Sequence, residues 1–411
     1  MEVKLTLNGS MLEMEKSIQD LVNDVGNATT MEALKKFDTN GDPIVIGDTR
    51  WTSMGLVEKI YQTPYGEVKI KRHVYQTFKG GKTYCPLDDK ARIIVTSTPQ
   101  FAKIVSNKFA NQGSTKVESD LKDNHGRFVA RSFLQNLADS VGSIAQAREE
   151  SWHYETPKID APVRSVSIGI DGTCMLLCNN GYRQAMVGTI SLYDEKGDRQ
   201  HTIYLGSTPE YGKESFEKRM EGEILHVKSI YPDAVYVGVA DGAKDNWEFL
   251  GKHVGKQILD FYHASGYLGN VSYAVFPRNE NKRKKWLDEQ CHNLKHEEGF
   301  VEKILTFMKT LTCKRLTKTI TEKLNSAVTY YENHKHQMLY PQYLSDHLPI
   351  GSGVTEAACK VLIKQRLCHS GMKWKERGAS IVLSLRALVM SGNRWEQFWN
   401  KIDQYGVPSE A

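Results

Sequence analysis

Three acidic residues stand in sequence surroundings that suit metal-assisted chemistry. Asp171 and Asp241 each precede a glycine in a β-rich stretch, and Glu356 follows the glycine-rich segment 351–353. Carboxylate oxygens are the ligands that Mg²⁺ and Mn²⁺ prefer, and two such ions can activate a water at a phosphodiester and stabilise the leaving oxygen. A single Asp-Gly pair is typical of a turn or strand end. The hypothesis therefore depends on the three carboxylates occurring together.

The elements that would position Asp171 and Asp241 are predicted between residues 163 and 263. Hydrophobic patterning and turn residues predict, in order, strands over 163–178, 185–193 and 201–205, a helix over 212–230, a strand over 234–240, a helix over 246–253 and a strand over 257–262. This is the element order of a ribonuclease-H-like α/β core with a mixed sheet. If the first and fourth strands are parallel neighbours, Asp171 and Asp241 lie side by side at the crevice beyond the strand ends.

Glu356 is predicted to lie in the first turn of a late helix. Ser352 or Thr355 can cap that helix, and the helix dipole favours a carboxylate near its N-terminus. A charged helical stretch separates this helix from the strands. We therefore expect the core to occupy 156–272, a helical insertion domain to occupy 273–346, and the final core helices, including a helix over 351–390, to occupy 347–400.

Asp260 and His263 are predicted to end the last strand, close to the carboxylates. A histidine there could orient a phosphate or hold Glu356. Taken alone, such a histidine is more typical of a structural residue.

Basic residues and one tryptophan follow Glu356. Basic side chains can contact phosphates, and an indole can stack on an unpaired base. The alternative is a solvated helix face with a core tryptophan; the basic run 282–285 is an even weaker indication of DNA contact. The candidate DNA-binding residues are Lys360, Lys364, Arg366, Lys373, Trp374 and Arg377.

The region before the core is predicted to be mixed α+β. Apolar residues at three- and four-residue spacing predict a helical arm within residues 1–40, namely Met11, Met14, Ile18, Leu21 and Val25. Strands over 44–78 and helices over 99–150 form a second region, 41–155, and residues 401–411 are a tail.

Composition narrows the class of protein. The 411 residues are 40% hydrophobic and 25% charged, which is typical of a globular chain and excludes a disordered or fibrous one. No apolar run is long enough for a membrane span, and no signal peptide is visible. Seven scattered cysteines fit reduced thiols in the cytoplasm. The net charge of +5 permits nucleic-acid binding without requiring it.

The sequence also contains residues that could form a zinc site. Five side chains in the charged helices could supply ligands, but their spacing matches no standard zinc motif. They are Cys291, His292, His296, His334 and His336.

Taken together, the motifs resemble those of DDE transposases of bacterial insertion sequences, most closely the ISKra type. The resemblance runs over most of the chain and is carried by segments 63–68, 72–75, 80–87, 149–152, 169–173, 240–243, 258–264, 349–353 and 370–374. It implies that Asp171, Asp241 and Glu356 are the catalytic triad. The spacing of 115 positions from Asp241 to Glu356 fits a helical insertion like that of Mutator-like and hAT relatives. Asp260 and His263 match the C/D-x-x-H motif of those relatives.

The resemblance also implies a function, a cofactor and partners. The expected protein binds the terminal inverted repeats of its element and cuts and joins double-stranded DNA, including the target, with two Mg²⁺ or Mn²⁺ ions. Region 41–155 would bind the DNA ends. A homodimer acting at the bacterial nucleoid is expected, with no membrane association. The alternatives are a transposase-derived DNA-binding protein without cleavage activity, and a ribonuclease-H-like nuclease acting on branched or hybrid nucleic acid.

Overall fold

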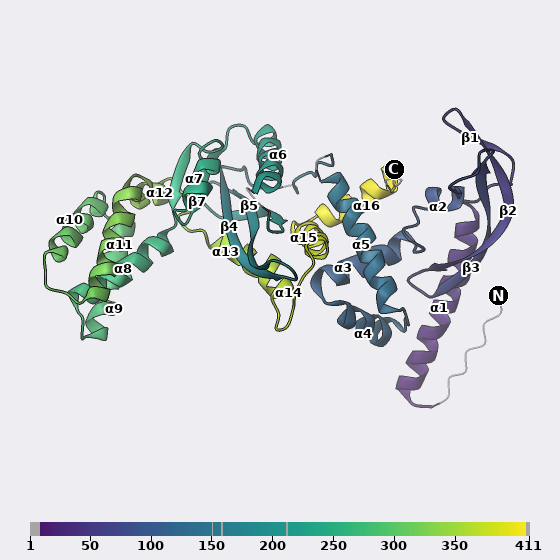
Figure 1. The fold of residues 1–411 in the computed structure, drawn as a ribbon, viewed down its shortest axis with the longest axis horizontal. Helices are drawn as coiled ribbons and strands as arrows, with labels where there is room; N and C mark the ends of the chain where they lie inside the picture. The colour runs from purple at the N-terminus through teal and green to yellow at the C-terminus, as the bar shows by residue number, and fades with distance from the viewer. Residues whose placement is uncertain (1–8, 150, 158, 211–212, 408–411) are drawn as a thin grey trace. The chain divides into compact units, whose positions relative to one another are not determined.

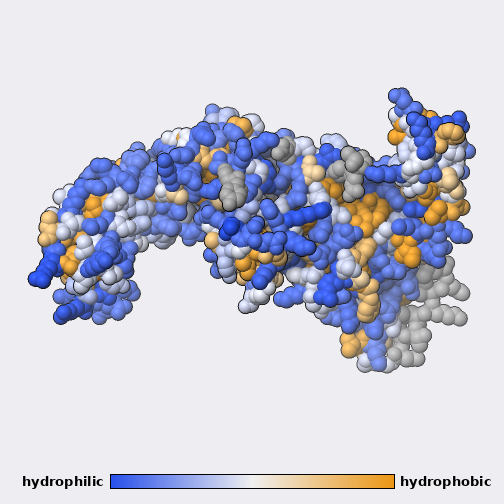
Figure 2. Space-filling model, in the orientation of Figure 1, coloured by the Kyte–Doolittle hydropathy of each residue, from blue (hydrophilic) through white to orange (hydrophobic). Residues whose placement is uncertain are grey.

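The computed structural model describes residues 9–149, 151–157, 159–210 and 213–407. The ends of the predicted arm and tail, residues 1–8 and 408–411, lie outside the described residues. The protein is a mixed α/β protein whose chain divides into two compact units. The first comprises residues 1–154, 377–389 and 393–411, and the second comprises residues 155–376 and 390–392. Figure 1 shows the ribbon of both, and Figure 2 shows apolar patches on a mostly hydrophilic surface.

The first unit combines a three-stranded antiparallel sheet with helices. The sheet has the order β1-β2-β3. As predicted, the chain forms a helix first, then strands, then helices. These elements are α1 (Met11–Lys35), β1 (Ile44–Ile46), β2 (Thr49–Gln62), β3 (Glu67–Thr77), α2 (Pro86–Lys90), α3 (Pro99–Asn111), α4 (Ser114–His125) and α5 (Arg131–Arg148). The C-terminal helices α15 (Glu376–Met390) and α16 (Arg394–Tyr405) complete this unit.

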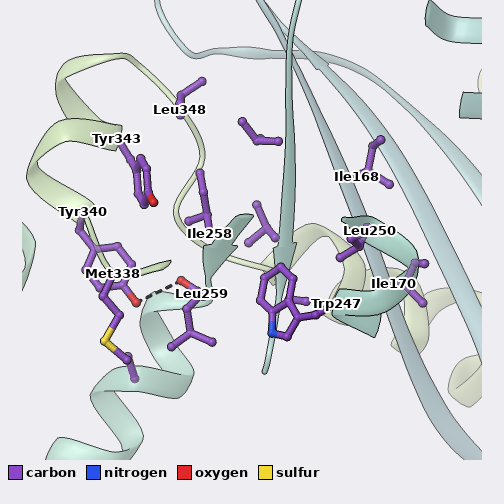
Figure 3. Packing of buried hydrophobic residues seen from close by; sticks show 14 of the residues in the cluster. Ile168, Ile170, Trp247, Leu250, Ile258, Leu259, Met338, Tyr340, Tyr343 and Leu348 are labelled. Atoms are coloured by element: carbon purple, nitrogen blue, oxygen red, sulfur yellow. Dashed lines mark hydrogen bonds between the residues drawn. The ribbon is translucent and has the colours of Figure 1, made fainter. Parts of the chain in front are cut away.

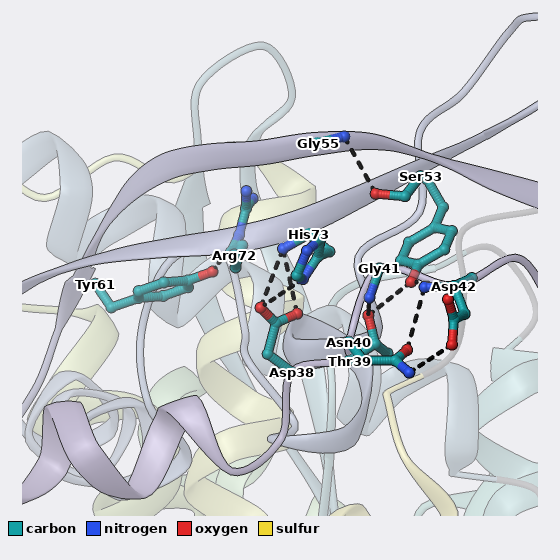
Figure 4. Close-up of polar contacts among 11 residues, drawn as sticks. Asp38, Thr39, Asn40, Gly41, Asp42, Ser53, Gly55, Tyr61, Arg72 and His73 are labelled. Carbon is teal, nitrogen blue, oxygen red and sulfur yellow. Dashed lines mark hydrogen bonds and ion pairs between the residues drawn. The ribbon is translucent and has the colours of Figure 1, made fainter.

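Buried polar groups join the start of β1 to the sheet (Figure 4). The Asp38 carboxylate accepts from the backbone N–H of His73 and lies 3.1 Å from its ring Nδ1. The buried Arg72 donates through Nε to the Tyr61 hydroxyl at 2.5 Å, and Tyr61 in turn donates to Asp88. The Asp38 contacts therefore fix the segment before β1 against β3, and the buried Arg72 finds its hydrogen-bond partner on β2, in Tyr61, which in turn reaches Asp88 of α2.

The second unit is built on a five-stranded mixed sheet of order β6-β5-β4-β7-β8. Strands β4, β5 and β6 are antiparallel, whereas β7 pairs parallel with β4 and β8 parallel with β7. This is the predicted element order, at β4 (Ser165–Leu177), β5 (Gly181–Tyr193), β6 (Arg199–Ser207), α6 (Glu214–Ile230), β7 (Val235–Ala240), α7 (Lys244–Leu250) and β8 (Lys256–Leu259).

Helices cover both faces of this sheet. Gly188 of β5 faces Phe216 and Met220 of α6 at contact distance. Side chains alternate along a strand, so the neighbouring Thr189 faces the other way. There its hydroxyl meets that of Thr355, in α13 (Gly353–Ala358), at 2.7 Å. The core between sheet and helices continues under the insertion, where Tyr340 donates to the carbonyl of Leu259 (Figure 3).

The insertion is helical, as predicted. Within the predicted bounds 273–346 lie α9 (Glu280–His296), α10 (Phe300–Thr312), α11 (Lys318–His334) and α12 (Tyr340–Ser345). Helix α8 (Phe261–Val275) precedes them and begins within the predicted core. None of the helices within the described residues combines the length and apolar character needed to cross a membrane.

Three sequence predictions differ from the structure. The last core strand ends at Leu259 rather than at residue 262, because Asp260 caps α8. The helix predicted over 351–390 is broken into α13, the π-helix η3 (Cys359–Lys364), α14 (Gln365–Leu367) and α15. Residues 377–389 and 393–400, expected with the core, cluster with the first unit. Their apolar faces pack there: Ile381 lies against Gly142 of α5.

Candidate active site

Asp171 lies within β4 on the sheet face that α13 covers. It is two residues beyond Gly169, and a Cβ at Gly169 would come within 2.0 Å of the Thr355 hydroxyl. The Asp171 carboxylate accepts from the backbone N–H of Gly172 at 2.6 Å, and the Cys359 thiol donates to it at 3.5 Å. Burial and the adjacent Asp171 charge both raise the pKa of the Cys359 thiol, so it remains a neutral donor.

Glu356 lies in the first turn of α13, as predicted. Ser352 occupies the N-cap, but its side chain makes no capping hydrogen bond. The Ser352 hydroxyl donates instead to Glu356 Oε1 at 2.9 Å. Thr355, the other predicted cap, bonds to Thr189 across the sheet. The two hydroxyls predicted as helix caps therefore have other roles: that of Ser352 orients the Glu356 carboxylate, and that of Thr355 holds α13 on the sheet.

One recess brings Asp171 and Glu356 together with two lysines. Its volume is about 670 Å³. The predicted basic residues Lys360 and Lys364 line it with exposed side chains. The whole lining comprises Asp171, Gly172, Thr173, Glu356, Cys359, Lys360, Lys364, Gln365 and His369. Two carboxylates with two cations provide oxygen ligands for a metal and positive charge for an anionic substrate.

Asp241 directly follows β7, the strand that pairs parallel with β4. The paired residues run from Ser165 and Val235 to Ile168 and Gly238, so the pairing ends three residues before each aspartate. Asp241 is outside the lining of the recess. Its carboxylate accepts from the backbone N–H of Ala243 at 3.1 Å, and the Tyr330 hydroxyl donates to its backbone carbonyl at 2.7 Å. The predicted adjacency of the two strands is confirmed, whereas a shared recess for all three carboxylates is not observed.

Asp260 and His263 lie beside Glu356, but at the start of α8 instead of a strand end. The fully buried Asp260 carboxylate accepts from the backbone N–H of His263 at 2.6 Å and from that of Ser352 at 2.5 Å. His263 Nε2 is 3.7 Å from Glu356 Oε1. Ligand atoms of these three side chains lie within 4.8 Å of one another. Since both Asp260 oxygens already accept hydrogen bonds, we interpret Asp260 as a positioning residue for its two neighbours.

The remaining predicted DNA-binding residues divide into exposed and buried ones. Lys373 is exposed, and Arg377 is exposed within the first unit. Arg366 is only 2% exposed and lies over the Trp374 ring at 5.2 Å, so its assignment as a surface phosphate contact is wrong. Trp374 donates its indole N–H to the Leu367 carbonyl and is half-buried. Trp374 forms an isolated β-bridge with Leu177, so the chain turns back to β4 after α14. This turn explains why the Arg366 and Trp374 side chains are shielded from solvent.

Sequence reasoning missed Cys359 and Gln365, which line the recess. The signal for Cys359 was its position three residues after Glu356, on the same helical face. No comparable signal marked Gln365, because the π-turn of η3 changes which residues of the following turn face the recess.

In the part of the chain that the structure describes, the candidate zinc ligands do not lie close enough together to hold one ion. There the Asp260, His263 and Glu356 group is the only set of three such side chains with ligand atoms this close together. The rings of His292 and His296 lie 4.8 Å apart and are tilted by 48°, while His334 forms a hydrogen bond with Gln337.

Comparison with known proteins adds no further assignment. No protein-family model matches the chain, and no curated protein matches it at the significance required.

Proposed function

We propose that the chain is an insertion-sequence transposase that binds the terminal inverted repeats of its element and performs metal-dependent DNA cleavage and strand transfer through a DDE triad. The second unit would be its ribonuclease-H-like catalytic core. The strand order β6-β5-β4-β7-β8, with β4 and β7 parallel, supports this fold assignment. The helices of the insertion separate β8 from α13 along the chain, as the proposed core requires.

The recess between β4 and α13 is the observation that carries the proposal. It unites Asp171 and Glu356, which are far apart in the sequence, and surrounds them with Lys360 and Lys364. A structural role alone would not require two carboxylates in one open recess. A metal ion would relieve their mutual repulsion, and the lysines would bind the phosphates flanking a scissile bond.

The donor set fits a hard divalent cation. Asp171 and Glu356 offer carboxylate oxygens in the recess, and Asp241 supplies a third carboxylate from the strand beside Asp171. His263 is exposed and close to Glu356, whereas Cys359 is a buried neutral thiol. Mg²⁺ or Mn²⁺ therefore suits these residues better than a thiolate-preferring metal.

In the proposed mechanism, the residues of the chain would hold the metal ions, orient the phosphodiester and neutralise its charge. Asp171 would be shared by two metal sites, with Asp241 on one and Glu356 on the other. Two bound Mg²⁺ ions would supply water activation and charge stabilisation at the leaving oxygen. Lys360 and Lys364 would hold the phosphodiester in line while a 3′-OH is released at the element end. That 3′-OH would then attack a phosphodiester of the target DNA in the same site, forming a new P–O bond as the bond to the target's own 3′-oxygen breaks and that oxygen leaves as a 3′-OH.

The first unit is the proposed binder of the element ends. Its long antiparallel pair β2–β3 exposes Lys59, Lys69 and Lys71. A two-stranded ribbon can enter the major groove of DNA, and exposed lysines on it can contact phosphates. A homodimer would bring two element ends together.

The test is strand cleavage of DNA that carries the inverted repeats flanking the gene, in the presence of Mg²⁺. Asp171→Asn and Glu356→Gln are expected to lose cleavage by at least about two orders of magnitude while still binding the DNA. Glu195→Gln, an exposed carboxylate in the turn between β5 and β6, is the matched control and should cleave normally. Normal cleavage by both recess variants would refute the assignment. Binding without cleavage by the wild type would favour the non-cleaving alternative.

A further inference from the structure

Helix α1 has an apolar face that the described residues of its own unit leave exposed. Met11, Ile18 and Val25 are 61%, 40% and 43% exposed, although all three are large and hydrophobic. Met14 and Leu21 lie between them and are half-buried. Exposed apolar side chains that line up along one helix face mark an interaction surface rather than scattered surface residues. We call this face the α1 seam; it consists of Met11, Met14, Ile18, Leu21, Val25 and Ala28.

The α1 seam lies on a different side of the helix from the contacts that α1 makes with its own unit. The backbone at Gly26 lies against the Tyr65 ring, where a Cβ would come within 2.4 Å. Asn27 accepts from the Thr63 hydroxyl at 3.0 Å, and Leu34 is buried in the sheet core. On a heptad in which Met11 is position a, Gly26, Asn27 and Leu34 occupy positions b and c, away from the seam positions a and d.

The residue types on the seam select its partner. The seam residues follow one another at alternating three- and four-residue steps, the average period of 3.5 that a coiled coil requires. In a parallel coiled coil, β-branched Ile18 and Val25 at position a, with Leu21 at position d, favour two strands over three or four. We propose that α1 pairs with α1 of a second copy of this chain, parallel and in register.

The flanking residues are compatible with this pairing. In a parallel coiled coil, each g residue faces the following e residue of the partner helix. Ser17 would then face Val22, and Asp24 would face Thr29, so these pairs bring no like charges together. Two exposed apolar residues of α1 lie outside the seam: Leu12, 78% exposed at position b, and Val22, 51% exposed at position e beside the seam.

The helix is already ordered before it meets a partner. Ser10 and Glu13 form a capping box at its N-terminus, with the Glu13 carboxylate accepting from Ser10 N at 2.7 Å. Its C-terminal half is packed on β3 through Gly26 and Leu34. Pairing therefore does not have to order the helix, which is the main cost for an isolated short coiled coil. The seam from Met11 to Val25 spans only about 21 Å, so we expect a concentration-dependent dimer.

The first test is the mass of the full-length protein without DNA, measured by sedimentation equilibrium at micromolar concentrations. The wild type should approach twice 46.6 kDa with increasing concentration. Ile18→Glu should remain monomeric, because it places two charges in the seam, and should stay folded by circular dichroism because Ile18 is exposed in the monomer. Lys16→Glu, at the outward position f, is the matched control and should dimerise. A monomeric wild type, or an Ile18→Glu variant that dimerises normally, would overturn the proposal.

The second test is oxidative crosslinking with a cysteine at one end of the seam, which reports the direction of the pairing. Met11→Cys should give a covalent dimer, because only parallel helices bring the two Met11 positions together, and Asn23→Cys, at position f, should give no more than the wild type with its own seven cysteines. Equal crosslinking of the two variants contradicts a parallel seam. Removal of residues 1–8 should leave the dimer unchanged. If that removal converts a monomer into a dimer, the chain's own N-terminal segment is the occupant and the proposal fails. Asp171→Asn should dimerise like the wild type, so these outcomes are separate from those of the proposed chemistry.

Discussion

At the scale of single residues, Asp260 links two segments that carry the candidate site. Its buried carboxylate accepts one backbone N–H from the first turn of α8 and another from Ser352, just before α13. His263 and Glu356 follow those two segments and approach each other to 3.7 Å. A carboxylate can accept both hydrogen bonds, whereas a neutral side chain of the same shape presents an N–H to one of them.

Asp260→Asn is therefore expected to lower the free energy of unfolding by roughly 1–3 kcal/mol, since one buried donor loses its acceptor. Cleavage should also fall, because the start of α13 loses its anchor. Chemical denaturation and the cleavage assay measure the two effects. Asp233→Asn, at an exposed position before β7, is the control and should change neither. A stability of Asp260→Asn equal to that of the wild type would show that these hydrogen bonds do not hold the segments together.

At the scale of elements, the approach of α13 to β4 determines where Glu356 lies relative to Asp171. Gly169 permits this approach, because the Thr355 hydroxyl occupies the space where a side chain would begin. Thr189 fixes Thr355 from the neighbouring strand by a buried hydrogen bond. The helix has little freedom to move without breaking that bond.

Gly169→Ala should displace α13, lower the free energy of unfolding by roughly 1–3 kcal/mol through overpacking, and reduce cleavage. Gly222→Ala is the matched control. Gly222 lies on the exposed side of α6 with open space around it, and alanine there should raise the free energy of unfolding by up to about 1 kcal/mol. Thermal denaturation of the two variants shows directly whether each substitution raises or lowers the free energy of unfolding. Similar effects in both would contradict the close packing of α13 on β4.

Much of the second unit could be predicted from sequence, because the residue pattern of its strands differs from that of the neighbouring segments. The turn at Asn180–Gly181 and the continuous apolar run of β7 allowed the order of elements along the chain to be predicted. Asp260 was misplaced because an aspartate after an apolar run can extend a strand or cap a helix. Arg366 was misjudged because a basic residue in a basic segment carries no sign of being buried. The first error is a local ambiguity between strand and helix cap, whereas the second concerns packing against the rest of the fold, which local patterns do not encode.

At the scale of the whole molecule, the first unit depends on segments from both ends of the chain. Buried Arg386 of α15 donates to the carbonyl of Ala110 at 2.7 Å, and burial lowers its pKa to about 10. Trp152 contacts Phe398 of α16 edge-on at 5.8 Å. Sequence could not assign α15 and α16 to this unit, because amphipathic helices do not indicate which neighbour they cover.

A fragment of residues 1–154 should therefore lack cooperative unfolding, whereas the same fragment joined by a flexible linker to residues 377–411 should unfold cooperatively. The reason is the apolar surface of α3 and α5 that α15 otherwise covers. Heteronuclear NMR and thermal denaturation of the two fragments provide the comparison. A well-dispersed spectrum from residues 1–154 alone would contradict this division of the chain.

The central claim is that Asp171 holds a metal ion that takes part in DNA cleavage, and cleavage by Asp171→Cys in Mg²⁺ and in Mn²⁺ tests it most directly. A thiolate is a softer ligand than a carboxylate, and Mn²⁺ tolerates such a ligand better than Mg²⁺. Asp171→Cys should be inactive with Mg²⁺ and regain measurable cleavage with Mn²⁺, whereas Asp171→Ala should be inactive with both. Asp171→Ala cleaving DNA like the wild type in either metal would contradict the claim.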